Sequence, residues 1–244
     1  MSGLPENQIF ALNSVRLRLD ADEHPWQTAE HKAIEAHWAR EQVERPWLFN
    51  GTVILHRGLG FTNGVLEGVS HRVSYAALLH FIDVWPEADV WHLFGSAVIL
   101  SSDNAMVLVR MGTQTANAGK VYAPSGALDN SDIRDGMIDV EGCIRREALE
   151  EVGLDPLTMR AEPQLLGWRR RGLIAVFRRF VAEETADQLL ARMRAHIKDA
   201  PEQEVEDVLA VRSTDEAGPT TPAYMRALLE HHFSDAEQAF SRSG

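Results

Sequence analysis

The stretch REALEEVGL, residues 146–154, sets three glutamates behind one arginine and ends at a glycine and an apolar residue. At about 100° per residue, Glu147, Glu150 and Glu151 fall within one arc of a helix. The opposite side is apolar and suited to packing on a sheet: Ala148, Leu149 and Val152. The stretch therefore predicts an amphipathic helix with an unusually acidic polar face.

Two interpretations of this acidic face are open. On a solvated surface, like charges at helical spacing cost only about 0.2–0.5 kcal/mol per pair. In a partly buried cleft, carboxylates about 5 Å apart repel each other by roughly 3 kcal/mol and need a cation. Carboxylate oxygens are hard ligands that suit Mg²⁺ or Mn²⁺.

The whole chain has the composition of an ordinary globular protein, with 244 residues, 45% hydrophobic and 25% charged. A net charge of −12 argues against a protein that binds nucleic acid polymers. A single cysteine, Cys143, excludes an internal disulfide, and a packing role is expected for it. No apolar run suits a membrane span, and the N-terminus lacks a signal-peptide layout, so a cytoplasmic protein is expected.

The order of predicted elements divides the chain at residue 92. Residues 1–92 are expected to form an N-terminal extension of helix, strands and helix, beginning with a helix over 22–45. Residues 93–244 intermix strands with helices, including a helix over 139–152. This order predicts a mixed β-sheet with helices on its faces.

The pattern Arg-Glu, two residues, Glu-Glu, one residue, Gly, apolar in residues 146–154 resembles the second half of the Nudix box. Upstream, YAPSGALD at residues 122–129 is similar to the strand and glycine loop that precede that box. The chain thus resembles the Nudix hydrolase superfamily over roughly residues 93–244. The resemblance implies an α/β (α+β) fold, an α/β/α sandwich around a mixed sheet, here with an N-terminal α+β extension.

The resemblance also implies a pyrophosphohydrolase that uses Mg²⁺ or Mn²⁺ and a metal-activated water. Its substrate would be a nucleoside diphosphate linked to another group. Metal ligands would be Glu147, Glu150 and Glu151, and catalytic roles would fall to Glu147, Glu150 and Arg146. Arg146 would pair with a neighbouring glutamate and hold its rotamer, while Gly126 would let the loop backbone approach closely and help to bind substrate.

The first half of the box is not matched. Its glutamate would fall on Ile138 and its first glycine on Asp132, because the loop after Gly126 is about six residues too long. Four acids of this loop could replace the missing carboxylate, or serve as turn formers and a cap: Asp129, Asp132, Asp135 and Asp139.

Other charged residues are weaker candidates. Of the acids at residues 202–206, Glu204 has the most suitable position for a further metal ligand, although all could be solvated loop acids. Arg169 and Arg171 lie where two strands meet and could bind substrate phosphates or form a solvated hairpin end. The ten histidines lack metal-ligand spacing, so surface or packing roles are expected.

The N-terminal part bears on substrate and partners. PWLFNG at 46–51 and SYAALLHF at 74–81 are faintly similar to the UDP-glucose-hydrolysing Nudix branch, which ranks a nucleotide sugar among the substrates. Shaping the pocket and forming a homodimer contact both stay open for this segment, and no membrane partner is expected. The alternative function is a catalytically silent Nudix-fold module that senses a nucleotide.

Overall fold

The larger of two β-sheets contains eight strands within the residues that the computed structural model describes, 4–200 and 204–241. These strands are β1 (Ile9–Leu12), β5 (His92–Leu100), β6 (Met106–Met111), β7 (Val121–Tyr122), β8 (Ser125–Ala127), β11 (Arg160–Arg170), β12 (Leu173–Val181) and β13 (Val205–Val211). The main order is β1-β11-β12-β5-β6-β13, with β7 on β6 and β8 on β5. β12 runs parallel to β5, whereas β11 pairs antiparallel with β12 and β6 pairs antiparallel with β5. The sheet is therefore mixed, as predicted.

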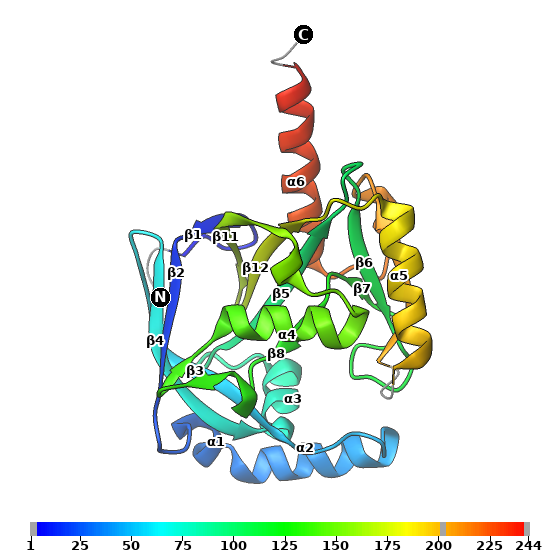
Figure 1. Ribbon diagram of the computed structural model, residues 1–244. Coiled ribbons are helices and arrows are strands. Elements are labelled where there is room, and N and C mark those ends of the chain that lie inside the picture. The colour runs from blue at the N-terminus through cyan, green and yellow to red at the C-terminus, as the bar shows by residue number, and fades with distance from the viewer. Residues whose placement is uncertain (1–3, 201–203, 242–244) are drawn as a thin grey trace.

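Helices cover both faces of this sheet: α4 (Val140–Val152), α5 (Ala186–Asp199) and α6 (Ala223–Ser241). α4 lies so close to β5 that a Cβ on Gly95 would meet Ile144 Cγ1 at 2.6 Å. α5 lies beside α4 (Figure 1). On the opposite face, the Tyr224 ring of α6 packs 5.1 Å from the Phe94 ring. The predicted α/β/α sandwich is confirmed.

Within residues 4–200 and 204–241, no helix combines the length and the apolar character that a membrane span requires.

The smaller sheet has five strands among the described residues, in the order β3-β4-β2-β10-β9. Its strands and the helices beside it are β2 (Ser14–Leu19), β3 (Thr52–Thr62), β4 (Val65–Ser74), β9 (Ile133–Arg134), β10 (Met137–Ile138), α1 (Pro25–Ala29), α2 (His31–Glu44) and α3 (Tyr75–Val84). α3 begins where Ser74 Oγ accepts the Ala77 N–H at 3.2 Å. The predicted α+β character of the N-terminal part is present.

The predicted single helix over residues 22–45 is wrong, because the chain leaves helical geometry at Glu30, with φ −95° and ψ 10°. α1 ends there and α2 begins. The break lets Trp26 of α1 stack on His80 at 5.9 Å, while Ile34 of α2 reaches the same hydrophobic core.

Both sheets contain strands from each side of residue 92. β1 pairs with β11, so that Ile9 faces Trp168. β10 pairs with β2, so that Met137 faces Arg18. One apolar core joins residues from both parts of the chain. The division into 1–92 and 93–244 stays a prediction about order along the chain, while in space the two parts interleave.

The long loop after β8 contains a β-hairpin that the sequence prediction lacks. β9 and β10 pair Arg134 with Met137 around a two-residue turn. Asp135 and Gly136 in that turn have positive φ values of 50° and 75°, the left-handed backbone that an Asp-Gly hairpin turn requires. The additional residues therefore extend the smaller sheet at its edge.

Three histidines are enclosed where the two parts of the chain meet: His24, His56 and His92. Burial is the main cause that lowers the pKa of His24 to about 4, that of His56 to about 3 and that of His92 to about 4. An unfolded histidine titrates near 6.5, so below that pH the unfolded chain binds protons that the folded chain refuses. We therefore expect the free energy of unfolding to fall as the pH drops from about 6.5 towards 4.

His56→Asn should weaken this pH dependence. Asparagine keeps a polar group near Ser70 Oγ, which lies 2.9 Å from His56 Nδ1. Urea unfolding between pH 5 and 6 should show a slope smaller by ~1.4 kcal/mol per pH unit, the contribution of one proton. Ser70→Ala, which removes the partner and keeps the histidine, should retain the steeper slope. Equal slopes in the wild type and His56→Asn would contradict this prediction.

Candidate active site

Helix α4 places two of its glutamates on the side that packs against the sheet. The helix begins where Asp139 Oδ1 accepts the Gly142 N–H at 2.8 Å, and it ends at Gly153 with φ 66°, both as predicted. Its buried residues recur at helical spacing: Val140, Cys143, Ile144, Glu147, Ala148, Glu151 and Val152. Two carboxylates therefore interrupt an otherwise apolar stripe.

The third glutamate lies outside this stripe. The Glu150 side chain is 59% exposed, and Leu149 beside it is 52% exposed. The prediction that Leu149 packs on the sheet is thus wrong, because its neighbour Ala148 points at the sheet and each further residue turns by about 100°. The acidic face combines two buried carboxylates with one exposed carboxylate.

Strand β8 closes over the two buried carboxylates. At Gly126, a Cβ would lie 1.9 Å from Glu147 Oε1, so the carboxylate occupies the space of a side chain. At Ser125, the backbone N–H donates to Glu151 Oε2 at 3.2 Å. β8 is held by β5, where Gly126 pairs with Gly95. The close approach predicted for Gly126 is made to Glu147, and its contact with substrate stays a prediction.

Arg146 is the cation nearest these carboxylates. Its Nη1 lies 2.7 Å from Glu147 Oε1 and 3.0 Å from Glu150 Oε2. Its Nη2 lies 3.1 Å from Asp132 Oδ2. The pairing that was predicted for Arg146 is present in this geometry, with two glutamates and one aspartate as partners.

The surroundings of the buried glutamates disfavour their charged forms. Burial is the main cause that raises the pKa of Glu147 to about 7; Arg146 opposes the shift, and Glu150 adds to it. Burial and the neighbouring Glu147 and Glu204 raise the pKa of Glu151 well above its ordinary value. A carboxyl cluster of this kind becomes fully charged at neutral pH only if a cation offsets the repulsion.

The role of Glu204 as a metal ligand stays a prediction. Glu204 directly precedes β13, and its backbone carbonyl accepts the Gly112 N–H at 2.7 Å. Its carboxylate is close enough to Glu147 and Glu151 to raise the pKa of both. Glu202, the first alternative, lies outside the described residues.

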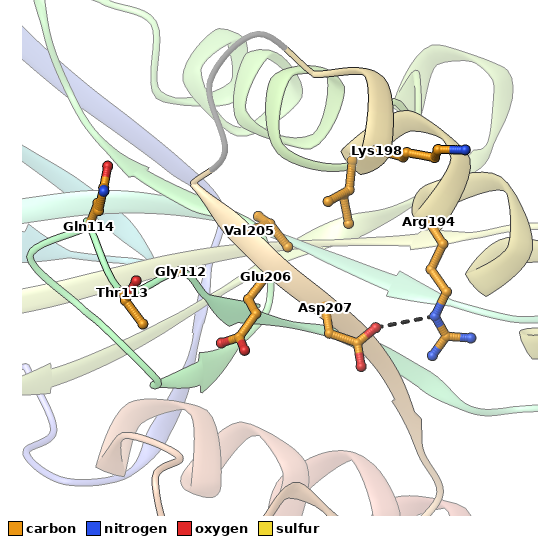
Figure 2. A pocket seen from close by; sticks show the side chains of 9 residues that line it. Gly112, Thr113, Gln114, Arg194, Lys198, Val205, Glu206 and Asp207 are labelled. Carbon is orange, nitrogen blue, oxygen red and sulfur yellow. Dashed lines mark hydrogen bonds and ion pairs between the residues drawn. The ribbon is translucent and has the colours of Figure 1, made fainter.

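A hollow of about 640 Å³ opens beyond Glu204, between β13, α5 and the loop after β6. Figure 2 shows Arg194 of α5 pointing at Asp207 of β13, and their Nε and Oδ1 atoms are 3.2 Å apart. Glu206 lines this hollow. Among the described acids before and within β13, the charge of Glu204 acts on both Glu147 and Glu151.

The four loop aspartates have different roles. Asp129 Oδ1 accepts the Ser131 N–H at 2.6 Å, and Asp139 caps α4. Both therefore serve as turn or cap residues, the second of the two roles left open by the sequence. Asp135 forms the exposed hairpin turn. Only Asp132 contacts the predicted site, through Arg146. Ile138, where the box has a glutamate, is 5% exposed in an apolar core.

The two arginines predicted to bind phosphates are engaged at the β11–β12 turn. Arg169 Nη2 lies 3.0 Å from Glu6 Oε2, and its guanidinium lies 5.8 Å from the Trp91 ring. The Arg171 guanidinium lies 5.9 Å from the Trp85 ring. These contacts tie the turn to the N-terminal part, and substrate binding by either arginine stays a prediction.

The sequence reasoning missed two cations, Arg45 and Lys120, whose charges interact. Arg45 follows α2, and its charge, after burial, lowers the pKa of Lys120 in the loop before β7. Burial raises the pKa of Tyr75, on which Arg45 and Glu204 also act. Figure 1 shows the end of α2 under that loop. No sequence signal joins these residues, because three distant segments bring them together.

The donor set fits a divalent cation in its chemistry. Four carboxylates, two of them buried, offer the hard oxygens that Mg²⁺ and Mn²⁺ bind. Within residues 4–200 and 204–241, no group of three or more acids, histidines or cysteines is already arranged around one metal position.

The candidate site thus consists of carboxylates on a helix, α4, that lie under a glycine-containing strand, β8, of a mixed sheet. No family model and no curated protein matches the chain. Solved structures similar to it include a MutT protein from Methanosarcina mazei Go1, which is 18% identical, with 60% of this chain and 95% of that chain covered and a TM-score of 0.40. A NUDIX hydrolase from Nitrosomonas europaea is 18% identical, with 61% and 90% covered and a TM-score of 0.36.

A third similar structure is the NUDIX domain of Shewanella oneidensis NrtR, crystallised with ADP ribose. It is 15% identical, with 68% of this chain and 98% of that chain covered and a TM-score of 0.38. At such TM-scores no residue-by-residue correspondence follows, so the function is argued from the site itself.

Proposed function

We propose that the chain is a Nudix pyrophosphohydrolase that depends on Mg²⁺ or Mn²⁺. It hydrolyses a diphosphate bond in a nucleoside diphosphate linked to another group, with a nucleotide sugar as one substrate. The observation that carries the proposal is the pair of buried carboxylates, Glu147 and Glu151, under β8 with Glu150 and Glu204 beside them. Burying such a pair costs folding free energy, which a structural role alone does not explain.

The residues have distinct roles in this proposal. Glu147, Glu150, Glu151 and Glu204 hold the metal, which when bound neutralises phosphate charge and helps to ionise water. Glu147 or Glu150 accepts the proton of the attacking water. Arg146 holds the rotamers of Glu147 and Glu150. Gly126 lets Glu147 lie against the backbone of β8.

Arg45 and Lys120 are the cations best placed to receive the substrate phosphates. The charges of Arg45 and Glu204 both act on Tyr75, and the charge of Arg45 acts on Lys120. In this structure Arg45 pairs with Glu41, and Lys120 donates to Asn117 Oδ1 at 2.9 Å. Arg45 directly follows α2. The N-terminal part would therefore shape the substrate pocket, which is one of the two roles expected for it beside a homodimer contact. A cytoplasmic location and a homodimer are retained as proposals, without nucleic acid polymers or membranes as partners.

One observation favours the alternative, a nucleotide sensor that does not hydrolyse. Arg146 already supplies a positive charge to both Glu147 and Glu150. In the alternative function, glutamates paired in this way need no metal when a nucleotide binds. The two functions differ in whether nucleotide binding needs Mn²⁺ and leads to turnover.

The test is release of nucleoside monophosphate from a panel of nucleoside diphosphate sugars and related diphosphates in Mg²⁺ or Mn²⁺. Glu147→Gln should lower kcat/KM by about 10²–10⁴-fold, the range for loss of an acid–base group. Glu141→Gln, on the first turn of the same helix and paired with Arg178, should keep the wild-type rate. Nucleotide binding by calorimetry without metal and without turnover would establish the sensor instead.

A further inference from the structure

The Asp132 carboxylate is enclosed and fully engaged. It is 2% exposed and ends a short 3₁₀ turn, Asn130–Asp132. Its Oδ1 accepts from Arg146 Nε and Nη2, both at 3.3 Å, and its Oδ2 accepts from Nη2 at 3.1 Å. Oδ2 also accepts the Asp129 N–H at 3.0 Å. Both oxygens are thus used by the protein itself.

This contact fixes the plane of the Arg146 guanidinium. A guanidinium that binds a carboxylate through two nitrogens loses the freedom to rotate about its last bonds. Here Nε and Nη2 face Asp132, which leaves Nη1 pointing at Glu147 and Glu150. Asp132 thus contacts one side of the Arg146 guanidinium, and two of the proposed metal ligands contact its other side.

The hairpin and the smaller sheet hold Asp132 in turn. Its backbone carbonyl accepts the Asp139 N–H at 2.7 Å, across the base of the β9–β10 hairpin. The hairpin tip is fixed to β2, where Gly136 O accepts the Leu19 N–H at 2.8 Å. Arg72 of β4 donates from Nε to Asn130 Oδ1 at 2.8 Å. The N-terminal sheet thus supports the turn that carries Asp132.

We propose that Asp132 is a positioning residue that orients Arg146 and, through it, the Glu147 and Glu150 carboxylates. The hairpin inserted after β8 and the N-terminal sheet are the frame that presents it. The inference rests on the proposed function, because that proposal assigns Glu147 and Glu150 as metal ligands.

The test is a double-mutant cycle read by Mn²⁺ affinity and by kcat/KM. Asp132→Asn should weaken Mn²⁺ binding and kcat/KM by about 10–100-fold, as loss of a residue that supports ligands does. In the Arg146→Gln background, the same change should add less than about twofold, because Asp132 acts through Arg146. Asp129→Asn, which alters the same turn without touching Arg146, should stay within about twofold of the wild type.

Arg146→Lys supplies a second variant if Asp132→Asn does not fold. Lysine keeps the charge and cannot make the two-pronged contact, so the same 10–100-fold loss of Mn²⁺ affinity is expected. Full Mn²⁺ affinity in Arg146→Lys would overturn the inference. Additive effects of Asp132→Asn and Arg146→Gln would also overturn it.

Mn²⁺ affinity also separates this inference from the proposed function. If no diphosphate is hydrolysed while the cycle in Mn²⁺ affinity is non-additive, the positioning role stands and the hydrolase assignment fails. If diphosphates are hydrolysed and the cycle is additive, the assignment stands and the positioning role fails.

Discussion

Glu151→Gln is expected to lower the rate of diphosphate hydrolysis by about 10²–10⁴-fold and to raise the melting temperature of the metal-free protein. Glu151 is 7% exposed, and the charges of Glu147 and Glu204 act on it. Glutamine keeps its shape and can still accept the Ser125 N–H, but it removes a charge that burial disfavours. Activity and stability should therefore change in opposite directions.

Scanning fluorimetry with and without Mn²⁺ checks this prediction. Mn²⁺ should raise the melting temperature of the wild type, because a ligand that binds only the folded state stabilises it. It should raise that of Glu151→Gln far less. Glu206→Gln, an exposed glutamate of β13, should respond as the wild type does. A variant at position 151 with full activity and a full Mn²⁺ response would remove Glu151 from the site.

Gly126→Ala is the second change with a large expected effect. The new Cβ would lie 1.9 Å from Glu147 Oε1 and 2.0 Å from its Cδ, so the carboxylate has to leave its position. A displacement of about 1 Å at a reacting group can cost about 100-fold in rate, and we expect at least that loss in kcat/KM. The melting temperature should also fall, since β8 is packed directly on α4.

Gly60→Ala is the matched control for this substitution. It also lies on a strand, its φ is not positive, and no heavy atom would lie within 4 Å of the new Cβ. It should retain activity and stability. The double change Gly126→Ala with Glu147→Ala should regain stability without regaining activity, since it empties the space that the new methyl group needs. A Gly126→Ala variant with normal kcat/KM would contradict the assigned position of Glu147.

Local features of the site could be predicted from the sequence because they depend on neighbours along the chain. The bounds of α4 follow from Asp139 as a cap and Gly153 in a left-handed conformation. The pairing of Arg146 with Glu150 follows from helical spacing. The mixed sheet follows from the order of strands and helices.

Features that depend on distant segments could not be predicted in the same way. That Glu147 and Glu151 are buried depends on β8 lying over them, which periodicity alone does not reveal. The proximity of Arg45 and Lys120 depends on how α2 packs against α3. The β9–β10 hairpin did leave a signal, since Asp135 and Gly136 form a favoured hairpin turn, and only the length of the loop obscured it.

The pairing of β1 with β11 has a consequence for how the chain reaches its native state. Ile9 finds its partner Trp168 only after most of the polypeptide has left the ribosome. Contacts so distant in sequence are slow to form, and until they do an unpaired edge stays available to other chains. Newly made molecules should thus be most prone to aggregate before β11 is synthesised, and chaperones that shield nascent chains should improve the yield.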